Sequence, residues 1–119
     1  MFDKYFKLPL RYEAGYPNVC TADGKMAFSW AGNISESAKK KIVSQINKPS
    51  QEKWPLSPMF SYNGRCHVLY DKKLMLIIRG WGMLTGVGGY SLDANTAIAI
   101  QNEFASFIVE QLNKFGKDE

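Results

Sequence analysis

The sequence is poor in the side chains that build metal centres. It has one histidine (His67) and two cysteines (Cys20 and Cys66), too few for a zinc site made of several such ligands. Apolar runs are short, and none approaches the roughly 18 residues of a membrane-spanning helix. The first ten residues lack the apolar core of a signal peptide. We therefore expect a cytoplasmic protein with no membrane contact, metal or cofactor. Reduced thiols are the default, and a Cys20–Cys66 disulfide is the alternative.

The composition is that of an ordinary globular protein. Apolar residues make up 45% and charged residues 22% of the sequence. A chain of 119 residues has the usual size of one domain, so we expect residues 1–119 to form a single domain. The chain contains 15 Lys and Arg against 11 Asp and Glu, and the net charge of +4 is a mild basic excess.

Two patterns predict strands in the N-terminal part. Apolar side chains recur at every second position over residues 6–12, which is typical of a strand with one buried face. Because Pro9 has no N–H to donate, we expect this strand at an edge of the sheet. Asp23-Gly24 is a typical two-residue hairpin turn. The register of that turn pairs Val19 with Phe28, and Thr21 with Met26.

A helix is expected after this hairpin. Asn33 and Glu36 have the spacing of a capping box, and the helix should run to about Lys48 because Pro49 stops it. Residues 49–57 are rich in proline without periodicity, which predicts a connector. The apolar stripe of the helix comprises Ala38, Ile42, Val43 and Ile46.

The second half repeats the pattern of hairpins followed by a helix. Asn63-Gly64 and Asp71-Lys72 each predict a two-residue turn, which would place His67 on the face of Phe60 and Leu76. Residues 74–78 are apolar at every position, as in a central strand that is covered on both faces. A final helix of about 20 residues should begin after Ser91 or Asp93 and end near Gly116.

These elements define the expected fold class. It is α+β, with an antiparallel sheet of about five or six strands packed against two helices, the longer one C-terminal. The segments Ile42–Lys48 and Ile108–Lys114 are identical at five of seven positions, which suggests a two-fold internal repeat. Its half-units would be residues 1–48 and 58–115. Chance similarity of two helix ends is the alternative.

The most unusual segment carries five glycines within residues 80–89. It lies between a strand and a helix, where backbone N–H groups can bind an anion or a nucleotide phosphate. Neither a Walker loop nor a dinucleotide fingerprint is present, so a purely structural role in bends and close packing is the alternative for these glycines. The candidate ligand or partner contacts here are Trp81, Gly82, Gly86, Gly88, Gly89 and Tyr90.

Basic residues are concentrated in the first half of the chain and suggest a nucleic-acid interface. Four aromatic residues there, Tyr5, Tyr12, Tyr16 and Trp54, could stack on bases. A solvated basic face is the simpler interpretation. The candidate nucleic-acid contacts are Lys7, Arg11, Lys39, Lys40 and Lys41.

No spacing of reactive residues indicates catalysis, so we assign no catalytic residue. Cys66 and His67 are neighbours on a predicted strand and therefore point to opposite faces. The carboxylates are assigned to turns, caps and the solvent side of helices, the last including Glu103 and Glu110.

Two stretches carry a resemblance. The turn Asp23-Gly24-Lys25-Met26 and the following helix resemble a module of small uncharacterised bacteriophage and prophage proteins. The sequence GWGMLTGVGG at residues 80–89, with the helix after it, looks like a tail found in phage-type and mobile-element proteins of gut bacteria. The resemblance implies a setting, the cytoplasm of a bacterial host, and no activity.

The leading hypothesis is therefore a non-enzymatic, phage-type accessory protein that binds a host or phage protein and forms homo-oligomers. Its support is a surplus of 16 aromatic residues, which a small domain can hardly bury completely. The alternatives are nucleic-acid binding through the basic N-terminal half, and nucleotide or anion binding at the glycine segment.

Overall fold

The structure is a computed structural model that describes residues 2–49 and 60–114. Five strands and four helical segments follow one another along the chain. Their bounds are η1 (Phe2–Lys4), β1 (Asn18–Cys20), β2 (Met26–Trp30), α1 (Glu36–Asn47), β3 (Phe60–Tyr62), β4 (His67–Tyr70), β5 (Lys73–Ile78), α2 (Trp81–Thr85) and α3 (Ala94–Leu112).

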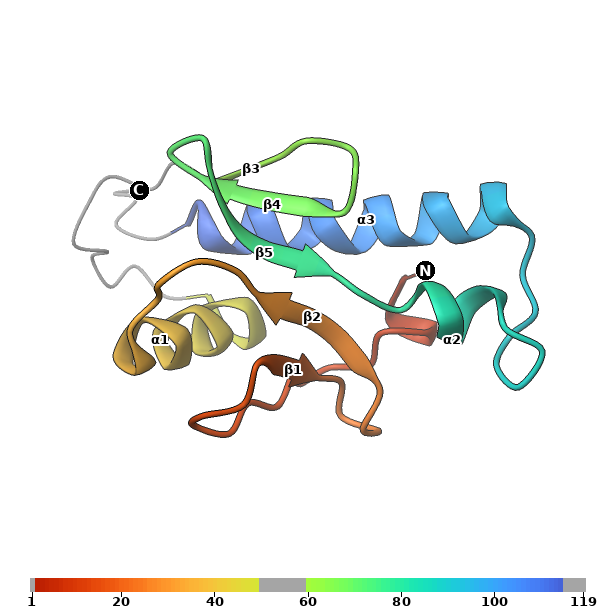
Figure 1. Cartoon of the computed structure of the whole chain (residues 1–119), viewed down its shortest axis with the longest axis horizontal. Helices are drawn as coiled ribbons and strands as arrows, with labels where there is room; N and C mark the ends of the chain where they lie inside the picture. The colour runs from red at the N-terminus through yellow and green to blue at the C-terminus, as the bar shows by residue number, and fades with distance from the viewer. Residues whose placement is uncertain (1, 50–59, 115–119) are drawn as a thin grey trace.

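The strands form one antiparallel sheet in the order β1-β2-β5-β4-β3. The long C-terminal helix α3 crosses behind β3, β4 and β5, and α1 lies beside it (Figure 1). The predicted α+β class, with hairpins and a longer C-terminal helix, is confirmed. The expectation of two helices is corrected by the short α2 and by the 3-10 turn η1.

The core lies between the sheet and the helices. Ring stacking between Phe6 and Phe104, with centroids 4.2 Å apart, attaches the N-terminal segment to α3. The largest side chains with almost no exposure come from both layers and from this segment. They are Phe6, Phe28, Phe104, Ile42, Ile46, Leu76, Leu84, Ile108 and Leu112.

The strand predicted over residues 6–12 is wrong. Only Arg11 forms an isolated bridge, to Cys20, and Leu8 is 36% exposed rather than buried. The two buried positions, Phe6 and Leu10, do follow the pattern. The Asn47 side chain hydrogen-bonds both the N–H and the carbonyl of Leu10. These backbone groups are therefore satisfied without a neighbouring strand.

The Asp23-Gly24 hairpin forms with a longer loop than predicted. Val19 lies opposite Phe28, as expected, but a bulge places Cys20 rather than Thr21 opposite Met26. The Gly24 N–H donates to the Thr21 carbonyl (3.0 Å), and Gly24 has a φ of +85°. This pattern is a turn followed by a left-handed glycine, the usual three-residue hairpin loop.

The Asn63-Gly64 turn is also longer, and this changes the face on which His67 lies. Tyr62 pairs with Val68, so Val68 shares the inner face and His67 points to the outer face, opposite Ile77. Because side chains alternate along a strand, shifting the pairing register by an odd number of residues moves each side chain to the other face of the sheet. The prediction that His67 shares a face with Phe60 is therefore wrong. The Asp71-Lys72 turn is confirmed, with φ of +49° and +65° at its two residues.

Strand β5 is central, as predicted, but its outer face is only partly covered. Leu74 is 39% exposed and Ile77 is half-buried. Met75 is the extra residue at a β-bulge and is buried. Figure 1 shows no described helix in front of this face.

The helix caps differ in one respect from the prediction. Ser35, not Asn33, caps α1, and its hydroxyl accepts the Ala38 N–H (3.2 Å). Asp93 caps α3, as expected. Residues 50–57 of the predicted connector, including Trp54, and Gly116 lie outside the described residues.

The similar heptapeptides lie at the adjoining C-terminal ends of α1 and α3. Gln45 Nε2 donates to the Gln111 carbonyl (3.0 Å), and Gln111 Nε2 donates to the Ile46 carbonyl (3.3 Å). The two glutamines occupy equivalent positions, and each donates to a main-chain carbonyl of the other heptapeptide. A duplication of two half-units stays a prediction.

Among the described residues, no helix has the length and apolarity that crossing a membrane requires.

Candidate functional site

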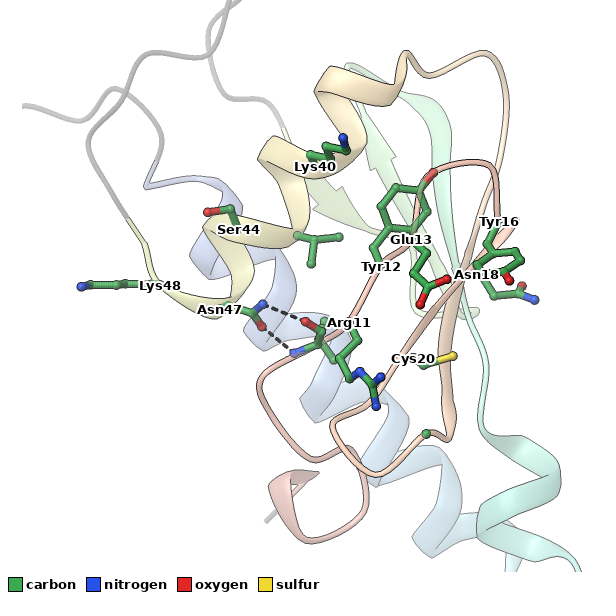
Figure 2. A pocket seen from close by; sticks show the side chains of 13 residues that line it. Arg11, Tyr12, Glu13, Tyr16, Asn18, Cys20, Lys40, Ser44, Asn47 and Lys48 are labelled. Atoms are coloured by element: carbon green, nitrogen blue, oxygen red, sulfur yellow. Dashed lines mark hydrogen bonds between the residues drawn. The ribbon is translucent and has the colours of Figure 1, made fainter.

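A groove of about 700 Å³ lies between α1 and the N-terminal segment (Figure 2). One wall is the face of α1 formed by residues at spacings of three and four, which a helix places side by side. The facing wall is residues 10–16, and β1 and its turn complete the groove. The lining residues are Leu10, Arg11, Tyr12, Glu13, Tyr16, Asn18, Cys20, Gly24, Lys40, Val43, Ser44, Asn47 and Lys48.

The groove is basic. Arg11, Lys40 and Lys48 line it and are exposed, whereas Glu13 is the single carboxylate among its lining residues. Two of the five predicted nucleic-acid contacts, Arg11 and Lys40, therefore lie in one depression although they are far apart in sequence. Lys48, one of the basic residues of the first half, was not selected as a candidate contact, but it lines the groove as the C-cap of α1.

The other predicted cations lie outside the groove lining. Lys39 forms an ion pair with Glu36 (3.6 Å), and its ammonium lies 5.8 Å from the centre of the Trp30 ring. The Lys7 side chain is exposed, and Lys41 is half-buried. The lysine run at residues 39–41 is thus divided between different faces of α1, as helical geometry requires.

Two aromatic residues face the same groove. The Tyr12 hydroxyl donates to Glu36 Oε2 (2.6 Å), and its ring meets Trp30 edge-on at 5.4 Å. Tyr16 lines the groove and is 57% exposed. Tyr5, a third stacking candidate, instead packs edge-on against Tyr90 at 4.6 Å, away from the groove lining.

Glu36, the first residue of α1, hydrogen-bonds the facing wall of the groove, residues 10–16. Its Oε1 accepts the Gly15 N–H (3.2 Å), while Oε2 accepts the Tyr12 hydroxyl. The Tyr12 hydrogen bond is the main cause that lowers the pKa of Glu36, assisted by Gly15 and Lys39. Partial burial, and then the Glu36 carboxylate, raises the pKa of Tyr12. At neutral pH the wall is therefore held by an ionised carboxylate.

Asn47, near the C-terminal end of α1, hydrogen-bonds the same wall at Leu10. Its Oδ1 accepts the Leu10 N–H (2.7 Å) and its Nδ2 donates to the Leu10 carbonyl (2.9 Å), as drawn in Figure 2. Asn113 makes the matching pair with Phe60, at 3.0 and 2.9 Å. Sequence reasoning missed both asparagines, although their shared position in the two similar heptapeptides is a signal for them.

The glycine segment is a short helix and a tight turn rather than an open loop. Trp81 and Gly82 lie in α2, and Gly86 is its C-cap. Backbone N–H groups at six of the residues from 84 to 92 donate to carbonyls within residues 80–86, so few remain for a phosphate. A Cβ on Gly89 would lie 2.1 Å from the Met83 carbonyl oxygen, whereas one on Gly88 would meet nothing within 4 Å. Close packing therefore explains Gly80, Gly86 and Gly89, whereas Gly82 and Gly88 have open space where a Cβ would lie.

The remaining reactive side chains do not converge. Cys20 and Cys66 are free thiols, and burial raises the pKa of the Cys66 thiol, which disfavours the reactive thiolate. His67 Nδ1 lies 3.1 Å from Asn63 Nδ2. Glu103, predicted on the solvent side, instead accepts the Phe2 N–H. Within residues 2–49 and 60–114, no three metal-ligating side chains form a cluster.

Comparison of the chain with family models, curated proteins and solved structures found no match. The resemblance to phage and prophage proteins stays a prediction, and the function has to be argued from the surface itself.

Proposed function

We propose that this protein is a non-enzymatic binding protein whose groove takes single-stranded nucleic acid. One observation supports this above all: Arg11 and Lys40, with Tyr12 and Tyr16, line the same groove. Cations and aromatic rings in one channel are the combination that single-strand binding proteins use, with charge for the backbone and rings for the bases.

The charged residues and the exposed tyrosine of the lining have different roles in this proposal. The Arg11 guanidinium suits the paired oxygens of a phosphate, and Lys40 and Lys48 act as point charges along the strand. The exposed Tyr16 ring suits an unpaired base, because a base inside a duplex has both faces stacked already. Glu13 repels phosphate and would keep the backbone on the α1 side.

The test is a salt titration with a fluorescently labelled, mixed-sequence DNA of about 12 nucleotides. Three phosphate contacts predict that log Kd rises with log salt with a slope of about 2 between about 50 and 200 mM. The variant Lys40→Glu should weaken binding strongly. The matched control Lys73→Glu makes the same charge change at an exposed strand residue outside the groove.

Two results would contradict the proposal. One is the absence of salt-dependent binding at the lowest salt. The other is an equal loss of affinity in Lys40→Glu and Lys73→Glu, since that would reflect net charge and not the groove.

The wider setting remains part of this proposal. We infer a phage-type accessory role in a bacterial cytoplasm from the sequence resemblance, and self-association from exposed apolar side chains outside the groove, which include Val87 and Ile98. Sedimentation velocity across a wide concentration range tests the second point, and a constant monomer mass would remove it.

A further inference from the structure

A second hollow, of about 580 Å³, lies where the start of β2, the end of β5 and α2 meet. It is separate from the groove, with no lining residue in common. Met26 and Trp81 line it and are each 44% exposed, so two large apolar side chains are open to solvent at the same place. The lining residues are Lys25, Met26, Cys66, Ile77, Ile78, Arg79, Gly80, Trp81, Gly82, Met83 and Gln101.

The charged residues that line this hollow are both basic. Lys25 and Arg79 line it, and its lining includes no Asp or Glu among the described residues. Arg79 is held in place, because its Nε donates to Ser29 Oγ (2.9 Å) and its carbonyl accepts from Gln101 Nε2 (3.4 Å). The carboxylate nearest in sequence, Asp23, accepts the Thr21 hydroxyl. An oriented guanidinium thus borders an apolar surface.

We propose that this hollow docks an acidic, amphipathic segment of a partner protein. Apolar side chains of the segment would pack on Trp81, Met26 and Met83, while its carboxylates would pair with Arg79 and Lys25. Trp, Met and Arg are the residue types that interfaces favour, and methionine adapts its shape to the partner. A nucleic-acid strand suits the hollow less well, since most of its lining side chains are apolar.

Gly82 allows this proposal to be tested by filling the hollow. A Cβ at Gly82 would meet no atom within 4 Å, and Gly82 lies in α2 without a positive φ. Gly82→Leu therefore places a side chain at the hollow whose Cβ meets no neighbouring atom, and a helix tolerates leucine better than glycine. Gly88→Leu is the matched control, because a Cβ there is equally free and Gly88 does not line the hollow.

The probe is a fluorescein-labelled helical peptide of roughly 14 residues, with leucines at spacings of three and four and glutamates elsewhere. A peptide with lysines in place of the glutamates is its partner. We expect the glutamate peptide to bind at least about tenfold more tightly, because opposite charges attract and like charges are penalised. Gly82→Leu and Trp81→Ala should each remove most of this binding, and Gly88→Leu should keep it.

Charge reversal and competition complete the test. Arg79→Glu leaves the charge of Lys25 balanced by a carboxylate, so it should abolish the preference for the glutamate peptide even if Gly82→Leu proves unstable. Lys40→Glu should leave peptide binding unchanged, so failure of the groove proposal and failure of this one are distinguishable. Equal affinity for the two peptides, no saturable binding up to about 1 mM, or displacement of the peptide by an oligonucleotide would each overturn the proposal.

Discussion

Replacing Asn113 by aspartate tests how the sheet edge is closed. The Asn113 carboxamide accepts the Phe60 N–H (3.0 Å) and donates to the Phe60 carbonyl (2.9 Å), so it occupies the place of a further strand. Asn113→Asp has nearly the same shape but no N–H donor. Its second carboxylate oxygen would face the Phe60 carbonyl oxygen, and two acceptors repel.

The expected loss follows from the burial of this pair. Phe60 is only 4% exposed, so water reaches its carbonyl poorly. One hydrogen bond contributes about 1 kcal/mol, and an unsatisfied buried acceptor costs about 1–3 kcal/mol. We therefore expect Asn113→Asp to lower the free energy of unfolding by about 2 kcal/mol at neutral pH.

Urea unfolding followed by circular dichroism measures this difference, with Asn95→Asp as the control. Asn95 is exposed in the first turn of α3, where a new negative charge is neutral or mildly stabilising. Protonation of the carboxylate introduced by Asn113→Asp restores a donor, so the folded-state pKa of that carboxylate should be raised. The missing stability should then return as the pH falls through that pKa. Equal unfolding midpoints for the two variants at neutral pH would refute the reasoning.

Two further predictions concern the glycine turn and the groove wall. Gly89→Ala should destabilise by about 1–3 kcal/mol because its Cβ would lie 2.1 Å from the Met83 carbonyl oxygen, whereas Gly88→Ala should be neutral or stabilise by about 0.5 kcal/mol. Similar thermal midpoints for these variants would contradict the packing explanation. The pKa of Glu36 is lowered chiefly by the Tyr12 hydrogen bond, so its stabilisation is complete above its ordinary value of 4.5 and is lost as the pH falls through the lowered value. The difference in thermal midpoint between the natural protein and Glu36→Gln should shrink in that acidic range, and a difference independent of pH would contradict this role.

Hairpins show where sequence reasoning reached its limit. Asp71-Lys72 was placed correctly because both residues adopt the positive φ of a two-residue turn. Asn63-Gly64 begins a longer connection in which Cys66 also has a positive φ, +66°. The dipeptide signals a turn but not its length, and the length fixes the parity of the register. His67 was therefore assigned to the wrong face.

The candidate site was predictable only in part. Basic and aromatic residues of the N-terminal half were recognised as candidates, yet composition could not select Arg11 and Lys40 over Lys7 and Lys39. Which basic residues line the groove depends on which face of α1 lies against residues 10–16. That contact joins segments that are far apart in the sequence. The hollow at Trp81 depends in the same way on β2 and α2 lying side by side.

By itself, the sequence determined the class of fold, the position of the long helix and the central place of β5. These features follow from periodicity, capping and local turn preferences, which act over a few neighbouring residues. Tertiary structure alone decided the register changes at the two longer turns, the hydrogen bonds that join Asn47 to Leu10 and Asn113 to Phe60, and the two surface depressions. Each of these features depends on contacts between segments that are far apart in the sequence. Such contacts produce no hydrophobic periodicity from which they could be predicted.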